Sequence, residues 1–280
     1  MTPRVVLRRW AVDAPRWPGG TDGAIPAHER AAEVLGRKGL LGTEPATRSA
    51  LCAVHRLLGL ADGAARNDGE PDPSTAVVVS SNLGNAATVA GVARTVRASG
   101  VRAASPLDAP NASSNVLASA VALRFRFGGP NVTVCSGHPS GLDAIGLGRL
   151  LIVAGRARRS VVVGVEPGGE VAEHLCPGIG GGAVGAVVLE ADDGEPDGSP
   201  LLGPVVDDRR AGGSRLRIEH GDGDRDIDVD GAGSTYGARG VLQVALGAAA
   251  LHADPAARAA HVTCGAAGDG FRSTHLGRNP

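Results

Sequence analysis

Asn131-Val-Thr-Val-Cys-Ser-Gly-His-Pro-Ser-Gly141, followed by the apolar run from Leu142 to Ala154, is the stretch of this 280-residue sequence that decides the fold. Residues 131–135 have the length and composition of a buried strand, and residues 142–154 have those of a helix. The Gly- and Pro-containing segment between them predicts a tight turn. A side chain at the apex of such a turn lies near the partial positive charge of the helix N-terminus. His138 is therefore the first candidate for chemistry.

Strands and helices alternate outward from this unit. The continuous apolar runs predict strands that are covered on both faces, and the alternation favours an α/β fold with helices packed on a mostly parallel sheet. The predicted strands are residues 5–7, 76–80, 131–135, 160–164 and 184–189, and the predicted helices are residues 28–60 with a break near 42–45, 86–98, 115–125 and 142–154.

A loop of Asp, Gly, Pro and Glu at residues 191–200 marks a boundary between a first half, 1–190, and a shorter second half, 191–280. Beyond the loop, Leu216 to Ile218 and Ile227 to Val229 alternate apolar with charged residues around a glycine turn. This pattern predicts a hairpin with one face in water. A helix over residues 237–252 and a short strand over residues 260–264 complete the predicted fold.

The aspartates of this hairpin also match the opening of a calcium-binding loop at residues 226–231. The twelfth position of that loop would be Gly237 in place of Glu, and a flanking helix is missing. Arginines opposite the aspartates, Arg215 and Arg217, explain the same charges. The four cysteines are widely separated and no His lies at zinc-ligand spacing from them. We therefore expect no metal and no cofactor.

Composition excludes several classes of partner. The 28 Lys and Arg residues nearly balance the 29 Asp and Glu residues, and the chain has only two Trp, one Tyr and three Phe. Such a sequence offers neither a basic field nor a stacking surface for nucleic acid. The first twenty residues carry charges and no long apolar run, and no stretch reaches the length of a membrane span. We expect a cytoplasmic protein with no membrane contact and an aliphatic core.

Several motifs then occur in an order that resembles one family. Ser105-Pro106, Gly129-Pro130, the turn at residues 135–144 and the Gly164-Val-Glu166 after the next strand resemble the first half of a β-ketoacyl synthase. Further on, residues 180–190, 233–240 and 264–268 resemble that family's later glycine motifs. The resemblance covers most of the chain and implies a thiolase-like αβαβα sandwich, in a compact version with a shortened second half.

The departures from the family pattern bear on activity. A β-ketoacyl synthase takes the acyl chain on a Cys thiolate and uses two His residues for decarboxylation and oxyanion stabilisation. On this resemblance the nucleophile position falls on His138, the second His position on Ser234 and the nearby Lys position on Val229. The chain thus lacks the Cys-His-His set, and we do not expect it to elongate acyl chains by the family's mechanism.

Chain-length factors of type II polyketide synthases also lack the Cys, and His138-Pro-Ser-Gly-Leu-Asp-Ala144 resembles their turn. This implies a non-elongating component of polyketide or fatty-acid-type biosynthesis that binds acyl chains. It would dimerise with a ketosynthase or with itself through residues 111–122, and it would meet an acyl carrier protein. The predicted acyl pocket consists of Asn115, Ser136, Ser140, Ser234, Cys264 and Ala266.

An enzyme that re-uses the fold is the alternative. With His138 as a catalytic base, the chain could carry out acyl transfer, hydrolysis, dehydration or decarboxylation, and a purely structural pseudoenzyme is a third hypothesis. No second His or acid is predicted beside His138 to complete a relay. Cys135 is expected to be buried in its strand, where an apolar setting raises the pKa of a thiol and makes it inert.

Overall fold

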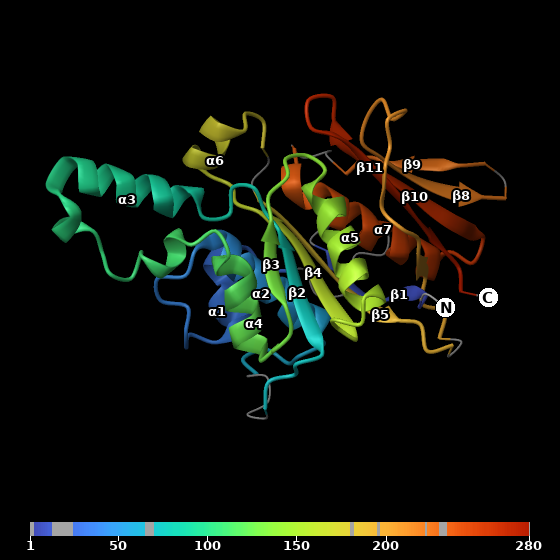
Figure 1. The fold of residues 1–280 in the computed structure, drawn as a ribbon, viewed down its shortest axis with the longest axis horizontal. Coiled ribbons are helices and arrows are strands. Elements are labelled where there is room, and N and C mark those ends of the chain that lie inside the picture. The colour runs from blue at the N-terminus through green and yellow to red at the C-terminus, as the bar shows by residue number, and fades with distance from the viewer. Residues whose placement is uncertain are drawn as a thin grey trace.

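One continuous sheet runs through the molecule, with helices packed against it in layers (Figure 1). The structure is a computed structural model and describes residues 3–12, 25–64, 70–179, 182–194, 197–221, 223–229 and 234–279. Among these residues the strand order is β3-β2-β4-β5-β1-β6-β11-β10-β8-β9, and β7 pairs with β11 beside this path. The strands are β1 (Val5–Val12), β2 (Thr75–Ser80), β3 (Asn131–Val134), β4 (Arg159–Glu166), β5 (Ala183–Ala191), β6 (Leu201–Leu202), β7 (Val206–Asp207), β8 (Arg215–His220), β9 (Arg225–Ile227), β10 (Ala257–Ala266) and β11 (Gly270–Gly277).

The helices follow the predicted pattern closely. They are α1 (Ala31–Leu35), α2 (Pro45–Leu57), α3 (Ala86–Ser99), α4 (Val116–Phe125), α5 (Ser140–Val153), α6 (Glu170–Leu175) and α7 (Arg239–Ala253), with short 3-10 turns η1 (His28–Arg30), η2 (Val101–Ala103), η3 (Pro110–Ala112) and η4 (Tyr236–Ala238). Within the described ranges, no helix combines the length and the apolar character that a membrane crossing requires.

Alternate residues of the central strands face two different cores. Val77 and Val79 of β2 pack with α2 and α4, whereas Val78 between them faces α5 and α7. A strand covered on both faces must be apolar at every position, which is why the central strands are continuous valine runs rather than alternating patterns. Figure 1 shows the resulting layers: α1, α2 and α4, then the first part of the sheet, then α5 and α7, then β8 to β11. The thiolase-like α/β architecture expected from the sequence is confirmed, in a compact version: within the described residues no helix forms the outermost α layer of an αβαβα sandwich over β8 to β11.

The second part of the sheet, β8 to β11, is covered by helices on one face only. Leu216, Val262 and Leu276 are buried against α7, while Arg217 and His261 point to the other side. No helix of the described chain packs over that outer face, as the open right side of Figure 1 shows. The alternation of apolar and charged residues in β8 therefore follows from a sheet with one face in water. The predicted hairpin is confirmed, with Leu216 opposite Ile227 and Arg215 and Arg217 paired with Asp226, whereas Asp222 and Asp230 lie outside the described residues.

The expectation of a mostly parallel sheet is wrong. Only the pairs β2 with β3 and β2 with β4 are parallel, and all other described pairs are antiparallel. Parallel neighbours need a long crossover such as α5, whereas β10 and β11 are joined by three residues and must run in opposite directions. The expectation that the fold ends with a strand near Cys264 is also wrong, because β11 follows and pairs with β10 along its length.

The two helices of the middle layer touch through their backbones. Gly141 of α5 faces Gly240 of α7, and a Cβ at Gly141 would lie 2.6 Å from the Gly240 nitrogen. Glycine is required on both sides of this crossing because no side chain fits between the helices. The contact fixes the start of α5, and with it the preceding turn that carries His138.

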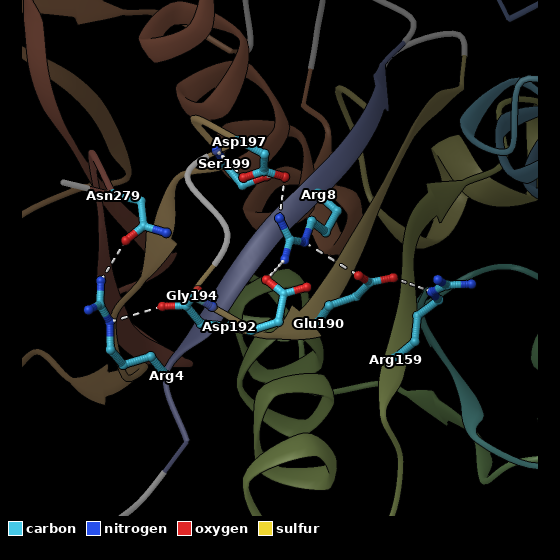
Figure 2. A network of polar contacts seen from close by, with 10 residues as sticks. Arg4, Arg8, Arg159, Glu190, Asp192, Gly194, Asp197, Ser199 and Asn279 are labelled. Atoms are coloured by element: carbon cyan, nitrogen blue, oxygen red, sulfur yellow. Dashed lines mark hydrogen bonds and ion pairs between the residues drawn. The ribbon is translucent and has the colours of Figure 1, made fainter.

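β1 joins the two parts of the sheet and contains a bulge at Arg8. The register of β1 with β5 shifts between Leu7 and Arg9, so Arg8 is the extra residue. Its guanidinium, only 14% exposed, forms ion pairs with Glu190, Asp193 and Asp197. Figure 2 shows this network between β1 and the segment after β5. Arg8 therefore links β1 to the segment between β5 and β6, which connects the two parts of the sheet.

Replacing Arg8 by Ala is expected to lower the free energy of unfolding by about 1–3 kcal/mol, because three carboxylates then lose their common cation. Arg159→Ala is the matched control. Among the described residues, Arg159 forms an ion pair only with Glu190, and its side chain is 41% exposed, so its loss is expected to cost less than about 1 kcal/mol. Denaturant unfolding at low and high salt measures both. Equal effects of the two substitutions would contradict this role of Arg8.

Candidate functional site

His138 lies in the turn between β3 and α5, at the N-terminal end of α5. Its side chain is 33% exposed. The preceding residue, Gly137, has φ +75°, a left-handed backbone conformation that favours glycine. The side chain of Asn82 fixes this residue from both sides, donating to the Gly137 carbonyl at 2.9 Å and accepting from its N–H at 3.2 Å. The backbone on which His138 stands is therefore held in place.

Asp269, in the turn between β10 and β11, binds His138 twice. One carboxylate oxygen, Oδ2, lies 2.8 Å from Nδ1 of the imidazole and accepts a hydrogen bond from the His138 backbone N–H at 2.9 Å. These hydrogen bonds hold the pKa of Asp269 below its ordinary value. A Cβ at Gly137 would overlap the same carboxylate, so glycine at this position is also what allows Asp269 to approach. The expectation that no acid lies beside His138 is wrong.

Tyr236 packs against the other side of the imidazole. The two rings are 4.8 Å apart between centroids and meet edge to face at 71°. Tyr236 has φ +38°, which is uncommon for a residue with a bulky side chain. Partial burial raises the pKa of its phenol, and the negative charges of Asp269 and Glu166 act in the same direction. The phenol therefore stays protonated at neutral pH.

Glu166 lies at the end of β4 and binds the backbone that carries Asn82. It is only 2% exposed, and it accepts hydrogen bonds from the Asn82 N–H at 2.8 Å and from the Leu83 N–H at 3.0 Å, with a longer one from the Ser81 hydroxyl. A backbone hydrogen bond from Gly237 links Glu166 to the η4 turn as well. Burial raises the pKa of Glu166 to about 7, because the charged carboxylate loses its water, although these donors favour the charge.

Three of the predicted pocket residues lie in the segments that meet at His138. The Cys264 thiol is 3.1 Å from the His138 carbonyl oxygen. The Ala266 carbonyl accepts from the Asp269 N–H at 3.1 Å and so closes the turn that carries this carboxylate. Ser234 precedes η4, and its hydroxyl accepts from the Tyr236 N–H at 3.3 Å. The structure thus places these residues in the shell around the His138 and Asp269 pair.

The other three predicted pocket residues are engaged elsewhere. Ser136 donates to Asp143 at 2.5 Å. Ser140 is fully buried, donates to the Val134 carbonyl at 3.0 Å and accepts from Ser80 at 2.9 Å, which ties the start of α5 to β2 and β3. Asn115 binds the side chains of Asn131 and Thr133 on β3 at 2.8 and 3.0 Å. Their role toward an acyl chain stays a prediction.

The expectation that Cys135 is buried is wrong. β3 ends at Val134, and Cys135 is an exposed residue of the following turn. Its sulfur nevertheless turns inward and lies 2.9 Å from the Ser81 carbonyl oxygen. Partial burial and the neighbouring Glu166 raise the pKa of this thiol. The thiol is therefore less reactive than an ordinary cysteine.

Sequence reasoning missed Asp269 and Tyr236. Both lie more than 90 residues from His138 along the chain, and spacing carries no signal at such distances. Two signals are present: Asp269 directly follows the Cys264-Gly-Ala-Ala-Gly268 motif, and Tyr236 lies inside the motif at residues 233–240. Asp269 is the one charged residue in this otherwise small and apolar loop, and His138 is its partner.

Residues 25–174 match the family described as "Beta-ketoacyl synthase, N-terminal domain". No curated protein sequence matches the chain. Among solved structures, "The ishigamide ketosynthase/chain length factor" is similar with a TM-score of 0.71 at 20% identity, over 98% of each chain. A β-ketoacyl synthase from Burkholderia phymatum STM815 is similar with a TM-score of 0.68 at 15% identity, over 99% of this chain and 100% of that one. The complex "AntDE:AntF (apo)", a type II acyl carrier protein with its ketosynthase, gives 0.66 at 13% identity over all of both chains. At these identities the solved structures show the fold.

Proposed function

Because the chain belongs to the β-ketoacyl synthase family, with residues 25–174 matching its N-terminal domain, we propose that it is a non-elongating, chain-length-factor-like component of polyketide or fatty-acid-type biosynthesis. It works in the cytoplasm, pairs with a ketosynthase or with itself, and holds an acyl chain delivered by an acyl carrier protein. The observation that carries the proposal is the residue at the turn before α5. His138 stands there, bound to Asp269 by its ring and by its backbone.

Chain elongation needs a nucleophile at this turn that forms a stable thioester with the growing chain. An imidazole whose Nδ1 is bound to a carboxylate does not supply one. The pKa of the thiol in this turn, Cys135, is raised, and its sulfur faces Ser81. The Cys264 thiol, 3.1 Å from the His138 carbonyl oxygen, is fully buried. Ser234 takes the place at which the family resemblance puts the second His, and its hydroxyl accepts a backbone hydrogen bond. These substitutions support a role that keeps the acyl-binding fold without the condensation chemistry.

The edge of the sheet supports pairing with another chain. β3 is the last strand on its side and pairs only with β2 among the described strands. Its Val132 is 38% exposed, and Leu123 of α4, the helix packed against β3, is 80% exposed. An unpaired edge with apolar side chains is a template for a strand of another chain. Asn115, which lies in the predicted interface segment, holds the β3 side chains Asn131 and Thr133 in position.

Co-expression with an active type II ketosynthase from the same genome tests the proposal. We expect the two proteins to co-elute as a dimer and the ketosynthase to release products of changed length in the presence of this chain.

Val132→Lys at the β3 edge is expected to weaken the complex at least tenfold, since a buried lysine needs a partner. Val206→Lys, at a valine on β7 that is 51% exposed, is the control and should leave binding unchanged. A dimer of this chain alone that Val132→Lys dissociates would identify a second copy as the partner. Unchanged products and no complex of either kind would contradict the proposal.

A further inference from the structure

The His138 and Asp269 pair has the geometry of a general base, a role that a passive acyl-binding partner does not need. We propose that this pair hydrolyses acyl thioesters, so that the protein also releases chains held at the site as free acids. The thioester substrate class rests on the function proposed above. The hydrolytic chemistry rests on the geometry of the two side chains.

The tautomer of His138 is set by its partner. The lowered pKa of Asp269 keeps the carboxylate ionised, and an ionised carboxylate only accepts hydrogen bonds. Nδ1, at 2.8 Å from it, therefore carries a proton. In the neutral imidazole the lone pair is then on Nε2. No hydrogen bond to Nε2 is formed by the described part of the chain, so this nitrogen is available to accept a proton.

Two contacts keep the ring in this orientation. The second hydrogen bond of Asp269, to the His138 backbone N–H at 2.9 Å, locks the carboxylate against the turn. Tyr236 packs edge to face on the ring. A base whose ring is fixed on two sides loses little freedom when it acts.

The exposure of His138 and Asp269 to solvent favours hydrolysis over the other reactions open to a general base. The side chains of His138 and Asp269 are 33% and 37% exposed, so the pair is open to water. Chemistry through a carbanion, as in dehydration or decarboxylation, needs a site that excludes water. Hydrolysis uses the water that is present and requires no further reactant.

The atoms balance with water alone. Nε2 takes a proton from a water molecule as its oxygen forms a bond to the thioester carbonyl carbon. The resulting oxyanion lies near the N-terminal end of α5, whose partial positive charge stabilises it. When the C–S bond breaks, the leaving sulfur takes the proton from Nε2. The products are a carboxylic acid and a thiol, and His138 returns to its starting state.

The test uses the purified full-length protein without a ketosynthase and octanoyl-pantetheine as the probe. Thiol release and mass spectrometry of octanoic acid measure turnover. We expect hydrolysis above the buffer rate that falls at least about 100-fold in His138→Ala. In Asp269→Asn, kcat is expected to fall at least tenfold with KM nearly unchanged, because the positioning residue acts on the base rather than on substrate binding. His138→Gln, which keeps a donor toward Asp269, provides a second inactive variant if His138→Ala does not fold.

Two controls separate this mechanism from others. Cys135→Ser removes the exposed cysteine of the turn, and His261→Ala removes a His on β10 whose side chain is 53% exposed. Both should hydrolyse the probe at the wild-type rate, and no acyl adduct should form on the protein. Loss of activity in Cys135→Ser, equal rates in wild type and His138→Ala, or no hydrolysis by the folded wild type would each overturn the inference. Complex formation is measured separately, so the absence of any complex, with a ketosynthase or with a second copy, together with unchanged products would overturn the proposed function and leave the hydrolysis result standing.

Discussion

Gly240→Ala is expected to destabilise the protein by about 3 kcal/mol or more and to lower its melting temperature by roughly 6–12 °C. A Cβ at this position would overlap the Leu142 nitrogen and the Gly141 carbonyl carbon. The obstacle is backbone rather than a flexible side chain, so α5 and α7 must move apart. That movement opens the core between the two parts of the sheet, which contains Leu142, Val241 and Leu246.

Gly91→Ala is the matched control for this substitution. Gly91 lies inside α3, and a Cβ there would meet nothing within 4 Å. Alanine removes backbone freedom from the unfolded chain and is expected to stabilise this helix by about 0.5–1 kcal/mol. Thermal and denaturant unfolding of both variants measure the difference. A Gly240→Ala protein as stable as wild type would show that the two helices can separate freely.

Raising the pH from 4.5 to above 7 is expected to remove about 2 to 3 kcal/mol from the free energy of unfolding through Glu166. The pKa of this carboxyl is raised by burial from 4.5 to about 7. The folded protein therefore binds the proton more tightly than the unfolded chain. The contribution is complete below pH 4.5 and is lost as the pH rises through 7. Urea unfolding at pH 4.5, 5.5, 6.5 and 7.5 measures this dependence.

Glu166→Gln removes the titration and is expected to flatten the pH dependence over this range. The absolute stability of the variant will also fall, because an amide nitrogen then faces the Leu83 N–H in place of Oε2. Glu219→Gln, on the exposed face of β8, should leave the slope as in wild type. The carboxyls whose pKa is lowered, such as Asp269 and Asp72, act in the opposite sense and at lower pH. An unchanged slope in Glu166→Gln would assign the dependence to another group.

Local patterns predicted the first part of the fold because its strands are continuous apolar runs and its helices are bounded by Gly and Pro. The second part was harder to predict. β11 has few apolar residues: His275 lies on its outer, water-facing side, whereas Arg272 and Thr274 lie on its inner side and bind Asp143 of α5 and the Gly203 carbonyl. Its identity as a strand comes from pairing with β10 rather than from its own composition. The short α6 (Glu170–Leu175) was missed because six residues do not establish a helical period.

The position of His138 was predictable from the turn motif, whereas its chemistry was not. Asp269 reaches it only because the β10–β11 turn folds over the start of α5, and this depends on the packing of α5 against α7. For Cys135 the local structure itself was wrongly predicted. Its neighbours in sequence predicted a strand, but the strand ends one residue earlier, and the residue is exposed.

The place of β1 in the sheet has a consequence during synthesis. β1 pairs with β5 and β6, so Val5 lies beside Ala191 and Val6 beside both Glu190 and Leu201. As the ribosome makes the chain, the first strand emerges long before either partner exists. Its buried Val5, Val6 and Leu7 stay exposed until about 190 further residues have been translated, an interval of roughly 10–40 s at usual elongation rates. The nascent chain is therefore expected to need a chaperone at its N-terminal segment until β5 and β6 leave the ribosome.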